Sequence, residues 1–160
     1  MEISPANTPT TMKIEDEIKQ KRFDSEFQKA VLNVKVTASW LSGITNNTLK
    51  PFGISAEQYN VLRILRGQYP KPSSLNTISE RMVDKMSNAT RLVEKLRKGD
   101  LVTREICPSN RRKVDILITQ KGLDLLAELD PVMRDALKES QQVSNQELEL
   151  LNSILDKMRG

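Results

Sequence analysis

The stretch SNATRLVEKLRKG, residues 87–99, predicts a short helix with one buried face and one polar face. Its apolar residues follow the three- and four-residue steps that place side chains on one side of a helix: Ala89, Leu92, Val93 and Leu96. The other side begins with a hydroxyl, an amide and a guanidinium and continues with two lysines: Ser87, Asn88, Arg91, Lys95 and Lys98. A helix face of this composition can bind another molecule, and the neighbouring sequence indicates which kind.

The segments on either side of this helix predict a helix-turn-helix followed by a hairpin. The stretch SLNTISERMV, residues 74–83, predicts a short buried helix, and the turn DKM joins it to the next helix. After Gly99 the apolar residues alternate with a period of two, which predicts strands at 102–106 and 114–118. The turn CPSNRRK lies between the strands and carries three consecutive cations: Arg111, Arg112 and Lys113. The second helix of a helix-turn-helix can enter a DNA major groove.

Helices are also predicted outside this central region. Residues 18–49 carry apolar side chains on more than one helix face, so this helix needs packing partners on two sides. Two pairs have the spacing of a capping box at a helix start: Ser55 with Gln58, and Ser144 with Glu147. Thr119 is predicted to cap the helix after the hairpin, which Pro131 is expected to kink or interrupt. We expect the end helices to form a dimerisation layer; the alternative is that they pack on each other within a monomer.

The charge distribution favours a polyanion as partner. The 160 residues have a net charge of +4, yet residues 81–121 alone hold 11 basic and 5 acidic residues. Such clustering is typical of nucleic-acid binding, and a solvated charged surface is the alternative. With no histidine and one cysteine, the chain can form neither an internal disulfide nor a Cys/His zinc site, which fits a reducing cytoplasm. The polar residues 1–17 are expected to be a flexible arm, and no apolar run is long enough to span a membrane.

The start of the helix at 87–99 has the chemistry of base recognition. Arg91 can donate two hydrogen bonds to guanine, and Asn88 can pair in the same way with adenine. Ser87 and Thr90 can donate to phosphate or contact a thymine methyl group, although the role we predict first for the Ser87 hydroxyl is the helix N-cap. Lys95, like Lys98, can contact phosphate, and solubility is its alternative role. The cations of the turn at 107–113 suit a narrow minor groove, and a solvated basic turn is the alternative.

The ordered set of these elements resembles a known family. The stretch ISERMVDKMSNATRLVEKLRKGDLVTREICPSNRRKVDILITQKGLDLL, residues 78–126, resembles the winged-helix core of the MarR family of bacterial transcriptional regulators. ISAEQYNVLRIL, residues 54–65, is similar to the helix that precedes this core. The likeness runs from about residue 18 to the C-terminus, and its strongest parts are SNATRLVEKL and the residues leaving the turn, NRRKV.

The resemblance implies a mainly α fold with a small β-hairpin. It implies a single domain at 18–160, with a winged helix-turn-helix DNA-binding region at 55–121 and dimerisation helices at 18–50 and 123–160. Each recognition helix of a homodimer would enter a major groove of a pseudo-palindromic operator, and each wing would touch the flanking minor groove. The resemblance also implies a repressor regulated either by oxidation or by a small aromatic or anionic ligand that releases it from DNA, with no cofactor.

By position, the resemblance assigns DNA reading to the helix start and to Arg112 of the wing. Asn110 stands where the family usually has an aspartate that steadies the wing, so we expect a more mobile wing tip. Cys107 lies beside the cations of the turn, which can lower a thiol pKa, but a lone cysteine at a strand end is more often inert.

Two other classes of protein were weighed against a DNA-binding regulator. A winged helix can bind proteins instead of a specific DNA sequence, but that role does not need base-reading side chains at the helix start. An enzyme is not expected, because the sequence holds no nucleophile motif, no phosphate-binding glycine loop and no metal cluster.

Overall fold

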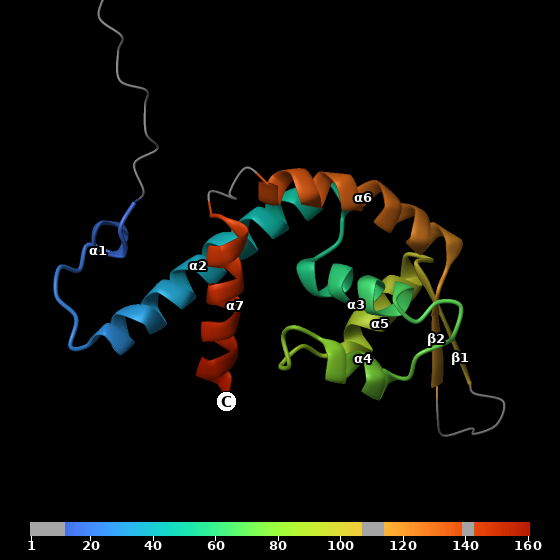
Figure 1. Ribbon diagram of the computed structural model, residues 1–160. Coiled ribbons are helices and arrows are strands. Elements are labelled where there is room, and N and C mark those ends of the chain that lie inside the picture. Colours follow the sequence, from blue (N-terminus) through green and yellow to red (C-terminus); the bar gives the residue numbers. More distant parts are fainter. Residues whose placement is uncertain (1–11, 107–113, 139–142) are drawn as a thin grey trace, which may run out of the picture. The chain divides into compact units, whose positions relative to one another are not determined.

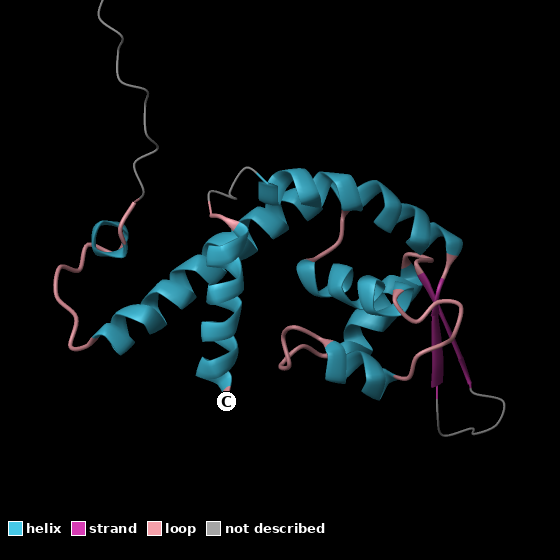
Figure 2. Cartoon of the chain, viewed as in Figure 1, coloured by secondary structure: helices cyan, strands magenta, loops and turns pink. Residues whose placement is uncertain are grey.

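The computed structural model describes residues 12–106, 114–138 and 143–160 (Figure 1). It confirms a mainly helical fold with one two-stranded antiparallel hairpin (Figure 2). The chain divides into two compact units, residues 1–43 and 44–160, which are described separately here.

The first unit contains a short helix and most of a long one. Helix α1 (Ile14–Glu17) buries Ile14, and the Glu15 carboxylate pairs with Lys29 on α2 at 2.5 Å. Helix α2 (Glu26–Leu49) begins eight residues later than predicted. Lys19 has a φ of 54°, and the Ser25 hydroxyl accepts a hydrogen bond from the Gln28 N–H at 3.1 Å. The prediction of a helix from residue 18 was therefore wrong, because a left-handed residue and a capping interaction set the later start.

The second unit begins with the last turn of α2 and a 3-10 helix, η1 (Lys50–Phe52). Three helices follow: α3 (Ala56–Arg66), α4 (Leu75–Arg81) and α5 (Ala89–Lys98). The strands β1 (Val102–Ile106) and β2 (Val114–Ile118) form the predicted hairpin, and their register places Val102 opposite Ile118. Two further helices complete the unit: α6 (Gln120–Lys138) and α7 (Asn145–Arg159).

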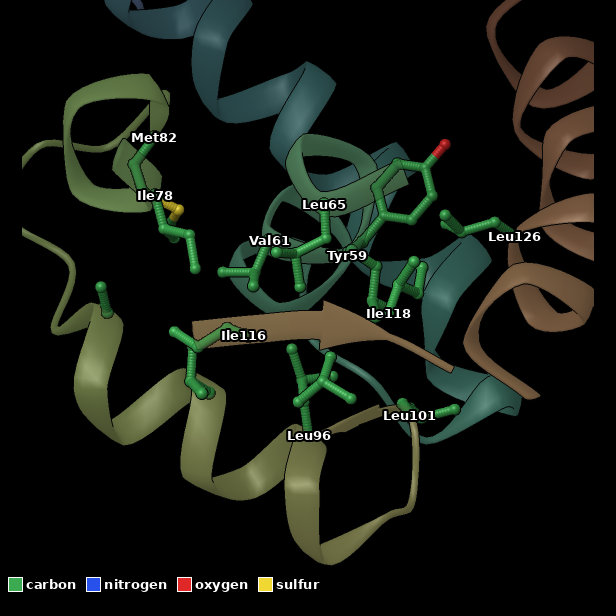
Figure 3. Close-up of a cluster of buried hydrophobic side chains, with 14 of the residues drawn as sticks. Tyr59, Val61, Leu65, Ile78, Met82, Leu96, Leu101, Ile116, Ile118 and Leu126 are labelled. Carbon is green, nitrogen blue, oxygen red and sulfur yellow. The ribbon is translucent and has the colours of Figure 1, made fainter. Parts of the chain in front are cut away.

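Helix α3 lies at the centre of the core of this unit. It packs against α4, α5, α6 and β2. Figure 3 shows side chains from these elements converging around β2, where Leu65, Leu96 and Ile116 are almost completely buried. Ser73 extends the hairpin, because it exchanges two backbone hydrogen bonds of 2.9 Å with Ile116. This packing connects α5 to the hairpin through one continuous apolar cluster.

Three predicted helix caps are confirmed, and α6 continues through Pro131. Both capping boxes are formed, those of Ser55 with Gln58 and of Ser144 with Glu147. The Thr119 hydroxyl accepts from the Gly122 N–H at 3.1 Å and so caps α6. Pro131 lies inside α6 without interrupting it, because the buried residues Leu129 and Met133 on either side hold the helix against the core.

Candidate nucleic-acid interface

The turn between α4 and α5 is held by one aspartate. The Asp84 carboxylate accepts from the Met86 N–H at 2.9 Å and from the Ser87 hydroxyl at 3.0 Å. The Val83 N–H donates to Asn60 of α3 at 2.9 Å. These bonds fix the direction in which α5 leaves the turn. Neither Asp84 nor Asn60 was predicted from the sequence. A D-x-x-S spacing before a helix was the available signal.

The N-cap of α5 is Asn88. Its side-chain oxygen accepts from the Arg91 N–H at 2.9 Å, whereas the Ser87 hydroxyl bonds to Asp84. The prediction of Ser87 as the N-cap was therefore wrong, because Asp84 already engages that hydroxyl. The cap holds the exposed Asn88 at the start of the helix, and its amide NH2 group remains a donor on this surface.

The outward face of α5 gathers most of the predicted recognition residues into one shallow hollow. Its lining consists of Asn88, Thr90, Arg91, Glu94, Lys95 and Lys98. All but Glu94 are exposed, while Ala89, Val93 and Leu96 on the other face are buried in the core. The prediction of a helix with one buried and one polar face is confirmed. Four cations or amides on one rigid face can bind phosphate and base edges.

Glu94 is the member of this hollow that sequence analysis missed. Its carboxylate accepts two hydrogen bonds from Arg97, from Nε at 3.0 Å and from Nη2 at 2.7 Å. The Arg97 hydrogen bond lowers the pKa of Glu94, and the charges of Lys98 and Arg104 contribute in the same direction. The same ion pair raises the pKa of Arg97. Glu94 follows Arg91 by three residues and precedes Lys98 by four, and this helical spacing was the sequence signal that it lies on the exposed face.

The base of the hairpin is bound firmly to both α5 and α6. The Thr119 N–H donates to the Leu101 carbonyl at 3.1 Å, and its hydroxyl donates to the Asp100 carbonyl at 2.8 Å. Lys121 of α6 donates to the carbonyl of Gly99, the C-cap of α5, at 2.9 Å. The end of α5, the start of β1 and the start of α6 are therefore connected at one point.

The tip of the predicted wing lies outside the described residues. This segment contains the predicted DNA contacts Arg111, Arg112 and Lys113, and also Cys107 and Asn110. The described strands on either side of this segment end their pairing with Ile106 opposite Val114.

The described part of the chain contains neither a metal-binding cluster nor a membrane-spanning helix. No group of three or more histidine, cysteine or acidic side chains there could hold a metal ion. None of the described helices is long and apolar enough to cross a membrane.

Comparisons with known proteins agree with this architecture. The family model described as MarR family matches residues 54–114, from the approach to α3 to the first residue of β2. A MarR transcription factor from Planctomyces limnophilus is 32% identical in sequence, with a TM-score of 0.64; the alignment covers 86% of this chain and 98% of that one. The regulator MhqR of Bacillus subtilis is 26% identical over 114 residues, which are 71% of this chain and 77% of MhqR.

A third protein is similar in fold. BpsR of Bordetella bronchiseptica is 21% identical with a TM-score of 0.72, over 82% of this chain and 99% of that one. The DNA binding of BpsR is regulated by 6-hydroxynicotinic acid.

Proposed function

The chain belongs to the MarR family of transcriptional regulators, which bind DNA, and we propose that it is a homodimeric repressor of a pseudo-palindromic operator. The observation that carries this proposal is the outward face of α5, where Asn88, Thr90 and Arg91 stand exposed on a fixed helix start. Side chains at the start of a recognition helix reach base edges, whereas later ones turn toward the backbone.

We expect the following individual contacts with DNA. Arg91 binds guanine through two donors, and the NH2 group of Asn88 donates to a neighbouring base. Thr90 donates to phosphate near the start of α5, and Ser87, whose hydroxyl donates to Asp84, lies beside it and holds the turn against the DNA. Lys95 and Lys98 contact phosphate along the later turns, while Arg111, Arg112 and Lys113 of the wing enter the minor groove. The bonds of Asp84 support these contacts, since they order the turn before DNA arrives.

The exposed apolar side chains of the end helices support a dimer. Helix α2 exposes Phe27, with 70% of its surface accessible, together with Trp40 at 48%. Helix α7 exposes four apolar side chains: Leu150, Leu151, Ile154 and Met158. Monomeric proteins rarely leave this much apolar surface in contact with water. A second copy that covers these helices would relate two α5 helices by a two-fold axis and so require an inverted repeat in the DNA.

A small aromatic or anionic ligand would release the dimer from DNA in the cytoplasm. The regulation of BpsR by 6-hydroxynicotinic acid, an aromatic acid, supports this class of ligand.

Selection of genomic DNA tests the proposal. The purified full chain is mixed with genomic fragments at near-physiological salt, and the bound fragments are sequenced. We expect an enriched inverted repeat whose half-sites lie about one helical turn apart. Arg91→Ala should lose this enrichment, whereas Lys71→Ala, which removes an exposed cation from the loop before α4, should keep it. Recovery of random fragments that wash off with salt would contradict the proposal and favour the protein-binding alternative.

A further inference from the structure

Glu94 lies in the middle of the face that the proposed function turns toward DNA. It follows Arg91 by three residues and precedes Lys98 by four, and it lines the same hollow as both. A carboxylate in this place is repelled by the phosphates of the duplex. A negative group there needs either neutralisation by a cation or a hydrogen-bond donor on the DNA.

The structure shows how this carboxylate is held. Arg97 donates one hydrogen bond to each carboxylate oxygen, which orients the planar group and offsets its charge. About 37% of the Glu94 side chain remains exposed. Each carboxylate oxygen has more than one acceptor position, so Glu94 can accept a further hydrogen bond while it stays paired with Arg97.

The major groove offers two kinds of donor to such an acceptor, the amino groups of cytosine and adenine. The adenine amino group lies beside N7, which is an acceptor and repels a carboxylate. The cytosine amino group has no acceptor on the same base edge in this groove. An ionised carboxylate therefore prefers cytosine, and the hydrogen bonds from Arg97 favour the ionised form of Glu94.

We propose that Glu94 reads a cytosine in each half-site, close to the guanine that Arg91 reads. Three residues advance a helix by roughly 4.5 Å, which is comparable with the roughly 3.4 Å between successive bases of one strand. The two side chains thus reach neighbouring base pairs. This inference rests on the proposed function and adds a residue that determines specificity, with Arg97 as its positioning residue.

Selection from a library of randomised DNA duplexes tests the inference with four full-length proteins. These are the wild type, Glu94→Gln, Glu94→Ala and the control Glu105→Gln. Glu105 is an exposed carboxylate on β1 outside the α5 hollow, so its substitution makes the same change of charge. Glutamine has nearly the same helix propensity as glutamate, and far-UV circular dichroism verifies that each variant is folded.

We expect the wild type to prefer cytosine about tenfold at one position beside the guanine. Glu94→Gln should change this preference to adenine, because an amide can accept from N6 and donate to N7. Glu94→Ala should remove the preference at that position alone. Glu105→Gln should keep the wild-type motif and strengthen binding equally on all sequences.

Two results would overturn the inference, and only one of them would also contradict the proposed function. Identical motifs for the wild type and both Glu94 variants would show that Glu94 acts only through its charge, while the proposed function would stand. No sequence preference by the folded wild type would overturn both the inference and the proposed function.

Discussion

Gly122 lies where α6 meets the base of the hairpin, and replacing it with alanine should destabilise the fold. A Cβ atom at this position would lie 2.7 Å from Cγ1 of Ile118 and closer still to the carbonyl oxygen of Leu101. The distance to Ile118 is about 0.7 Å short of the 3.4 Å at which ordinary contact begins. Both neighbours are fixed, since Ile118 is buried in β2 and the Leu101 carbonyl accepts from the Thr119 N–H.

The expected cost has three parts. Displacing Ile118 in a packed core costs about 1–3 kcal/mol. Moving the Leu101 carbonyl weakens its hydrogen bond, which contributes about 1 kcal/mol. Alanine offsets about 1 kcal/mol of this, because glycine is the poorer helix former. We therefore expect Gly122→Ala to lower the free energy of unfolding by about 1–3 kcal/mol.

Urea unfolding followed by circular dichroism measures this cost, at one protein concentration because dimerisation would make stability depend on it. The control is Gly67→Ala at the end of α3, where a Cβ atom meets its nearest neighbours at 3.5 Å and φ is −65°. This variant should be as stable as the wild type or up to about 1 kcal/mol more stable. A Gly122→Ala protein with wild-type stability would refute the argument that close packing requires glycine here.

Three further predictions concern DNA binding and stability. Arg91→Ala should weaken operator binding by about 1–3 kcal/mol and reduce the sequence preference at one base pair. Lys98→Ala should weaken binding to all DNA sequences equally and make the affinity depend less on salt concentration. Fluorescence anisotropy measures both effects. Asp130→Asn should lower stability at pH 7 by about 1 kcal/mol after discounting for solvent screening, because it breaks the pair with Arg66 at 2.7 Å. Arg66 lowers the pKa of Asp130, so the stabilisation by this ion pair is present above the ordinary pKa of 3.8 and is lost as the pH falls through the folded pKa. In urea unfolding, the stabilities of the wild type and Asp130→Asn should therefore differ at pH 7 and approach each other at pH 3. Ser73→Ala should leave the urea midpoint unchanged or raise it, by up to about 1 kcal/mol in stability, because the Ser73 hydroxyl is buried without a hydrogen-bond partner in the described structure.

Each of these predictions has a contradicting result. Equal losses on operator and random DNA for Arg91→Ala would remove its role in base reading. A stability difference for Asp130→Asn that persists unchanged at pH 3 would show that the carboxylate acts through packing. A destabilised Ser73→Ala would indicate that the hydroxyl has a partner in solution.

The hairpin and the helix caps could be predicted because their signals are local. The alternation of Val102 to Ile106 and of Val114 to Ile118 specifies two strands by itself. The same holds for the capping box of Ser55 with Gln58, where two side chains satisfy each other's backbone groups.

The misjudged features depend on contacts between elements or on competing caps. Ser87 has the right chemistry for an N-cap, but Asp84 engages its hydroxyl and Asn88 takes the role. Pro131 has lost its helix hydrogen bond, yet the burial of its neighbours keeps α6 continuous. Glu94 was not predicted because the sequence argument considered only cations and amides, although the same helical spacing places Glu94 between Arg91 and Lys98.

The sequence predicted which residues share the exposed face of α5, and their contacts with DNA are still a prediction. The periodicity of residues 87–99 was enough to place Asn88, Thr90, Arg91 and Lys95 on one face, as the structure has them. The wing cations lie outside the described residues, so their contacts depend on experiment.

Protection of guanines from methylation by dimethyl sulfate tests the central claim most directly. The reagent modifies guanine N7 in the major groove, which is the acceptor that Arg91 is proposed to occupy. In complexes on the selected operator, the wild type should protect one guanine in each half-site, with the two guanines symmetric about the centre, and Arg91→Ala should leave both reactive. A sequence-specific complex that protects no guanine, or one whose protection persists in Arg91→Ala, would contradict the account.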